Sequence, residues 1–395
     1  MMSQTQLEKR ERIPELNLVR CMAILGVLTV HSSSFATLNM IDSGMYGVYN
    51  FFNIFMKFGT PTFIFLSSFV LFYNYYTRPL DKQLVTGFYK KRLLYILIPY
   101  FMFSLFYFGI LHVTHYPDRS LVDTITSFTD KLFTGKAYTH LYFVFINMQF
   151  YILFPLVLWL FKKAPSLVKW AVPIGLAIQW GFILMNKYGV ISVANKGSWS
   201  PSYFAYFMLG AFLGVYFPKI KQWIVMKKEY ATPAKITAWI GLWVVWLGAG
   251  IAHAQIWYLN RKGIAVYDSL WYEFLWNLHT FAAALVLFQI AFLLYKRERG
   301  QNMFVRGMSR IGGLSFGIYL IHPFFLLIYR EFPPQTGISM LHHLWYVGGF
   351  LVALIGSYIV VSLASRIPQS WILFGNLPKP KKKERTIGEK RDLPA

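Results

Sequence analysis

An arginine and a histidine stand eleven residues apart in the first apolar stretch of this chain. The stretch VRCMAILGVLTVHSSS (19–34) is otherwise uncharged, and Arg20 and His31 interrupt it. A guanidinium group stays charged and binds anions, whereas an imidazole titrates near neutral pH and can act as a general base. In a helix, this spacing places the two side chains roughly 20° apart around the axis and about 16 Å apart along it. The pattern therefore predicts a cation and a candidate base on one helix face.

The composition predicts that this helix crosses a membrane. Of the 395 residues, 56% are hydrophobic and only 14% are charged, whereas a soluble domain carries about 25% charged residues. Apolar runs long enough to span a bilayer, about 17–25 residues, occur ten times, at 16–36, 51–73, 93–112, 141–161, 168–186, 203–218, 236–256, 274–295, 314–331 and 341–363. We therefore expect an all-α, polytopic membrane protein. Its domain organisation would be a short N-terminal segment, a membrane domain and a basic tail, at 1–15, 16–365 and 366–395.

The distribution of basic residues predicts the orientation of these spans. If the N-terminus is inside, 28 of the 39 Lys and Arg residues fall in cytoplasmic segments and only 7 fall in external loops. This excess follows the positive-inside rule, so both termini should be cytoplasmic. The expected location is the plasma membrane. The net charge of +23 then indicates no nucleic-acid partner. The run KPKKKER (379–385) is expected to be solvated or to touch lipid headgroups.

Ionisable residues inside a membrane span seldom face lipid. Arg20 alone could extend to the headgroups and His31 alone could be a hydrogen-bonded core residue, but together on one face they favour a lined cavity. His322 is a second candidate base in the ninth apolar run, although Pro323 frees a backbone carbonyl that would also suit a structural histidine. Further polar residues that we expect to line the acceptor path or pore, toward the external side, are His140, Tyr142, Asn147 and Tyr319. No metal-binding pattern is present, so no metal and no bound cofactor are expected.

Five segments in this order resemble the membrane-bound acyltransferase-3 family. They are the Arg20–His31 spacing, FGTPTFIFLSSFVLF (58–72), YKKRLLYILIPYF (89–101), HLYFVFINMQFYILFP (140–155) and SFGIYLIHPFFL (315–326). The likeness covers about 16–365 and is greatest to members associated with Gram-positive surface polysaccharides. The chain departs from the family pattern at Ser67-Ser68, where Ser-Gly is common, and at Lys90, where the first of two arginines is common.

The resemblance implies a membrane enzyme that transfers an acyl group, expected to be acetyl, from cytoplasmic acyl-CoA to a hydroxyl of an extracytoplasmic polysaccharide. His31, or otherwise His322, would be the base. Arg20, Lys90 and Arg92 would bind the phosphates of acyl-CoA, unless 90–92 is only a topology signal. Some relatives carry an additional esterase-like domain, and only a short basic segment follows the last span here. The acyl group is therefore expected to pass directly to the glycan or to a separate protein.

Two other functions remain open from the sequence. Some similar proteins have been regarded as polysaccharide exporters, and ten aromatic-rich spans could form a path for a glycan. No inverted repeat of the kind found in many transporters is evident. A structural partner of a polysaccharide synthase is the third possibility, but it would leave the buried His31 without a role. We favour the acyltransferase.

Overall fold

The computed structural model describes residues 11–295, 302–335 and 338–378, so the basic run 379–385 and most of segment 1–15 lie outside the described residues. Within these ranges the chain is helical and contains no strand. Among the described residues, ten helical segments are long and apolar enough to cross a membrane. The predicted all-α polytopic fold is confirmed, whereas the orientation of the termini stays a prediction.

The longer helices are α1 (Leu16–Ser33), α3 (Tyr46–Phe55), α4 (Gly59–Tyr75), α5 (Lys82–Arg92), α6 (Ile98–His115), α7 (Leu121–Thr134), α8 (Tyr142–Lys163), α9 (Ala171–Lys187), α10 (Phe204–Ile224), α11 (Pro233–Arg261), α12 (Ser269–Leu294), α13 (Met303–Arg330) and α14 (Ser339–Ala364). Short helices and turns are α2 (Ala36–Asn39), η1 (Met56–Phe58), η2 (Leu93–Leu97), η3 (Pro165–Trp170), η4 (Lys196–Ser198), η5 (Ser200–Tyr203), η6 (Lys228–Tyr230), η7 (Pro368–Ser370) and α15 (Trp371–Phe374).

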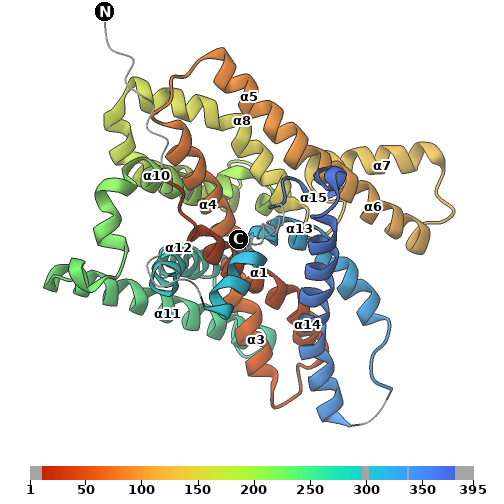
Figure 1. The fold of residues 1–395 in the computed structure, drawn as a ribbon. Helices are drawn as coiled ribbons and strands as arrows, with labels where there is room; N and C mark the ends of the chain where they lie inside the picture. Colours follow the sequence, from red (N-terminus) through yellow and green to blue (C-terminus); the bar gives the residue numbers. More distant parts are fainter. Residues whose placement is uncertain (1–10, 296–301, 336–337, 379–395) are drawn as a thin grey trace, which may run out of the picture.

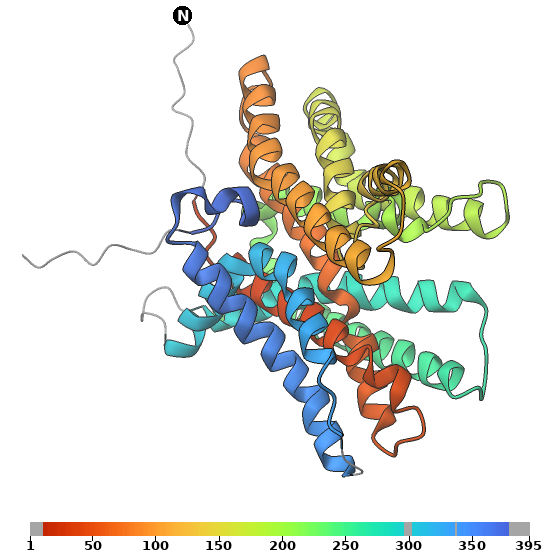
Figure 2. The ribbon, with the colours of Figure 1, turned by 90° about the vertical axis from the view of Figure 1, so that its right-hand side faces the viewer.

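Helix α1 lies near the centre of the bundle and contacts α3, α4, α12, α13 and α14 (Figures 1 and 2). Glycines bring the neighbouring backbones close to it. A Cβ on Gly312 of α13 would lie only 1.7 Å from the carbonyl oxygen of Asn17, and a Cβ on Gly59 of α4 would lie 2.5 Å from Cγ2 of Val27. Small residues at such contacts allow close packing in lipid, where no hydrophobic driving force joins the helices. The helix that carries Arg20 and His31 is therefore firmly placed.

The second span is interrupted, although the sequence predicts one continuous run over 51–73. Helix α3 ends at Phe55, the turn η1 follows, and α4 begins at Gly59. Pro61 has no N–H to donate to the carbonyl of Lys57 four residues earlier, which disfavours an unbroken helix at this point and suits the first turn of a new one. The interruption places Lys57 at mid-span.

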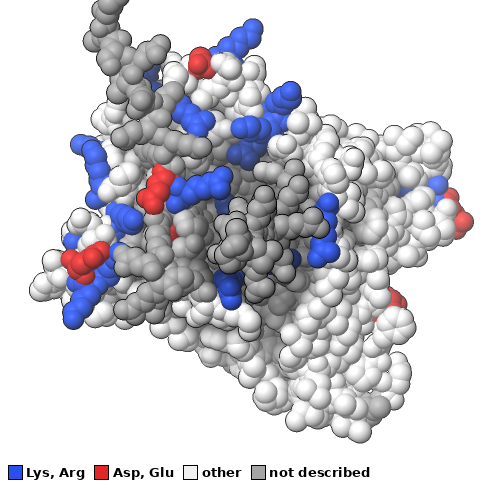
Figure 3. Space-filling view, viewed as in Figure 1, with Lys and Arg blue, Asp and Glu red and all other residues white. Residues whose placement is uncertain are grey.

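Helix α14 illustrates how the bundle meets lipid. Its exposed apolar side chains follow one another about one turn apart, at Leu344, Val347, Leu351, Ile355 and Ile359. The surface over the first half of this helix shows no Lys or Arg, whereas most basic side chains lie toward the top, left and centre of the view (Figure 3). An apolar stripe beside a charged region is typical of a membrane protein.

Candidate active site

Three histidines from distant parts of the chain lie together beside α1. The ring centroids of His31 and His322 are 5.1 Å apart, and those of His322 and His140 are 5.5 Å apart. His31 comes from α1, His322 from α13, and His140 from the segment just before α8. The structure therefore brings together both histidines that the sequence proposes as bases. Among the described residues, no three His, Cys, Asp or Glu side chains are placed to hold a metal ion.

Hydrogen bonds to backbone carbonyls fix the protonation pattern of two of these rings. Nδ1 of His322 lies 2.8 Å from the carbonyl oxygen of Tyr319, and Nε2 of His140 lies 3.2 Å from that of Leu320. A carbonyl oxygen only accepts, so these two nitrogens carry the protons. Within the described part of the chain, Nε2 of His322 and Nδ1 of His140 are buried without a hydrogen-bond partner. Each ring thus keeps a free lone pair inside the cluster.

His31 is the member of this cluster that reaches open space. It lines a cavity of about 410 Å³, which we call the His31 cavity, whereas His322 and His140 are 0% exposed. Nη2 of Arg330 donates a 2.6 Å hydrogen bond to the carbonyl oxygen of His31 and holds the end of α1 in place. A base must reach the proton that it removes. His31 meets this requirement, and the buried ring of His322 packs against it.

A second cavity, of about 220 Å³, is lined by both arginines that the sequence proposes for donor binding, and we call it the Arg20 cavity. Nη1 of Arg20 donates to the side chain of Asn17 at 2.9 Å, and the guanidinium of Arg92 lies 4.6 Å from the ring centroid of Tyr151. Among the described residues, neither arginine forms a salt bridge with a carboxylate. Two unpaired guanidinium groups at one cavity are suited to bind an anion.

The remaining predicted residues take different places around the two cavities. Tyr319 lines both of them, and its hydroxyl donates to the carbonyl of His140. Tyr142 lines the His31 cavity, where its hydroxyl lies 3.4 Å from that of Thr60. Asn147 lines the Arg20 cavity and not the His31 cavity. Lys90 is exposed and lines neither cavity.

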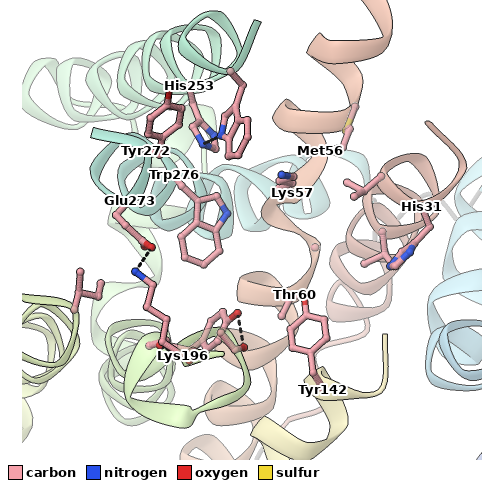
Figure 4. A pocket seen from close by; sticks show the side chains of 18 of the residues that line it. His31, Met56, Lys57, Thr60, Tyr142, Lys196, His253, Tyr272, Glu273 and Trp276 are labelled. Carbon is pink, nitrogen blue, oxygen red and sulfur yellow. Dashed lines mark hydrogen bonds and ion pairs between the residues drawn. The ribbon is translucent and has the colours of Figure 1, made fainter. Parts of the chain in front are cut away.

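Several residues of the His31 cavity did not emerge as site residues from the sequence. Figure 4 shows Lys57, His253 and Trp276 around the cavity, together with Lys196, whose amine pairs with Glu273 at 2.5 Å. Lys57 had one recognisable signal, since it is a charged residue inside an apolar run. The others come from different helices and loops, and their meeting depends on the packing of α11 and α12 against η1 and the segment before α10.

The fold and the two cavities define a polytopic membrane protein with a titratable site in its interior. Residues 13–362 match the acyltransferase-3 family, whose model is described as "Acyltransferase domain". The match covers nearly all of the membrane region, so the chain belongs to this family and is an acyltransferase.

A curated relative agrees with this assignment. The chain is 22% identical over 400 residues to a Bacillus subtilis (strain 168) protein that bears the name "Putative membrane-bound acyltransferase YfiQ". The alignment covers 96% of this chain and 99% of that protein. No solved structure gives a significant match to this chain.

Proposed function

We propose that this acyltransferase moves an acyl group, acetyl in the simplest case, from cytoplasmic acyl-CoA to a hydroxyl of an extracytoplasmic polysaccharide at the plasma membrane. One observation carries the proposal. Arg20 and His31 project from the same helix into two separate cavities, and Tyr319 lines both cavities. In the predicted orientation, the Arg20 cavity lies toward the cytoplasm, where acyl-CoA is made, and the His31 cavity lies toward the outside.

The residues of the His31 cavity suit a direct transfer. His31 takes the proton from the acceptor hydroxyl while that oxygen attacks the thioester carbonyl carbon. The carbon–sulfur bond then breaks, the ester is released, and the proton on His31 returns to the sulfur of CoA. The hydroxyls of Thr60 and Tyr142 line the cavity and are suited to donate to the oxyanion that forms on the carbonyl. His322 is a positioning residue, because it packs against His31 without reaching the cavity.

Removal of the guanidinium groups is expected to weaken donor binding. In Arg20→Ala or Arg92→Ala, the KM for acyl-CoA should rise about tenfold to a hundredfold, because a hydrogen bond to a charged group contributes about 1.5–3 kcal/mol. The difference from wild type should shrink as ionic strength rises, because salt screens the phosphate charge. Steady-state kinetics at two salt concentrations measure both effects.

Lys90→Ala is the matched control for Arg92, because Lys90 stands in the same basic run and lines neither cavity. Its KM for acyl-CoA should stay within about twofold of wild type, as for a surface charge. Wild-type KM values in both the Lys90 and the Arg92 variants would show that the run acts only as a topology signal.

The release of CoA separates this function from glycan export. Purified protein in vesicles, supplied with acetyl-CoA and a soluble oligosaccharide, should release free CoA at a rate that depends on the oligosaccharide concentration. The oligosaccharide should gain one ester-linked acetyl group for each CoA released. Transport of the oligosaccharide across the vesicle membrane without CoA release would contradict the proposal and support an exporter.

A further inference from the structure

Lys57 is a charged side chain in the middle of the membrane region. It stands in the turn that separates α3 from α4 and lines the His31 cavity (Figure 4). Among the described residues, no carboxylate lies within salt-bridge distance of its amine. Its amine lies over the ring of Trp257, with Nζ 5.0 Å from the ring centroid. A cation inside a membrane span is costly and usually marks a functional site.

The other charges around this cavity do not neutralise Lys57. The carboxylate of Glu273 forms a salt bridge with Lys196 at 2.5 Å. A second cation lies nearby, since the guanidinium of Arg261 is 5.2 Å from the same Trp257 ring. Arg261 donates to the neutral side-chain oxygens of Asn50 and Asn53, each at 3.1 Å, and not to a carboxylate. Arg261 does not line the cavity, so Lys57 is the cation that faces it, and the charge of Arg261 beside the same tryptophan adds to the positive potential there.

The cavity also offers aromatic surfaces of the kind that bind sugars. Trp257 and Trp276 line it together with Tyr272, and Trp257 and Tyr272 pack edge to face with centroids 5.0 Å apart. The apolar faces of sugar rings pack on such side chains, whose area dominates the energetics of an interface. Aromatic side chains beside an unpaired cation are suited to a sugar that carries a negative charge.

We propose that Lys57, assisted by Arg261, forms an anion subsite, so that the acceptor is an acidic glycan with a carboxylate or phosphate close to the hydroxyl that His31 activates. This inference rests on the proposed transfer to a polysaccharide and names its substrate class. Lys57 and His31 line the same cavity, and the glycine contact between α4 and α1 holds the two elements together. The subsite therefore places the acceptor relative to the base and selects acidic over neutral sugars.

Three matched trisaccharides test the subsite directly by binding. They end in glucuronate, glucose 6-phosphate or glucose, so that they differ only at carbon 6 of one sugar. Binding to the full-length protein in lipid nanodiscs is measured by calorimetry, without acyl-CoA. Wild type should bind the glucuronate ligand, the phosphate ligand or both at least tenfold more tightly than the glucose ligand, and which of the two binds identifies the acidic group.

Variants of Lys57 then assign the preference to this side chain. Lys57→Met should abolish the preference while its affinity for the glucose ligand stays at the wild-type value, which also shows that the variant is folded. Lys57→Arg should retain most of the preference. Lys187→Met is the control, because that lysine pairs with Asp268 at 2.8 Å and does not line the cavity. Equal affinity of wild type for all three ligands, or a preference that survives in Lys57→Met, would overturn the subsite.

The same ligands distinguish failure of the subsite from failure of the proposed function. Acetyl-CoA is added, and CoA release and ester formation are followed for each trisaccharide. A Lys57-dependent preference in binding without ester formation on any ligand would retain the subsite and reject the proposed acetyl transfer to a glycan. Ester formation with equal KM for the acidic and neutral ligands would retain the transferase and reject the subsite.

Discussion

His31→Ala is expected to lower acyl transfer by about 10²–10⁴-fold, the usual contribution of a general base. His31 is the member of the histidine cluster that lines a cavity, whereas His322 and His140 are fully buried. The variant should still accumulate in the membrane, because a methyl group in place of an imidazole removes a desolvation cost. Turnover of acetyl-CoA with a saturating acceptor measures the loss.

His31→Gln separates catalysis from positioning. Glutamine retains hydrogen-bonding groups but cannot accept the proton, so this variant should be as inactive as alanine. Affinity for acyl-CoA should be unchanged in both variants, because Arg20 and Arg92 line the other cavity. Near-normal turnover in His31→Gln would assign the base to another residue, and His322 would be the first to test.

Gly312→Ala is expected to destabilise the protein and to impair catalysis without touching a catalytic residue. A Cβ at this position would lie 1.7 Å from the carbonyl oxygen of Asn17 and 3.1 Å from the amide nitrogen of Cys21. Both are backbone atoms of α1. Backbone atoms cannot rotate away, so α1 and α13 must separate. Overpacking of this kind costs about 1–3 kcal/mol or more. Because His31 and His322 lie on these two helices, the separation should also lower turnover.

Gly307→Ala provides the matched control on the same helix. A Cβ there meets no atom within 4 Å, and alanine is the better helix former by about 0.5–1 kcal/mol. Thermal unfolding in detergent should therefore show a lower midpoint for Gly312→Ala and an equal or higher midpoint for Gly307→Ala. Equal midpoints for the two variants would mean that α1 and α13 are not packed as closely as the structure shows.

The sequence by itself determined the class of fold and one part of the site. Apolar runs of bilayer length predict membrane-spanning helices, because only hydrogen-bonded helices and closed barrels are stable in lipid. The sequence also predicts that Arg20 and His31 lie on one helix face, because both residues belong to one helix whose period is known. In the described part of the chain, the structure has ten helices able to span a membrane and shows both side chains lining interior cavities.

The partners of these residues were decided only by the tertiary structure. The contact of His31 with His322 depends on the close approach of α1 and α13 at Gly312, which no local pattern encodes. The same holds for Asn147 in the Arg20 cavity and for Lys57 beside Trp257. In lipid, apolar side chains gain little by choosing one apolar neighbour over another, so helix partners are set by shape and by a few polar contacts. Such complementarity between helices appears only when they are packed together.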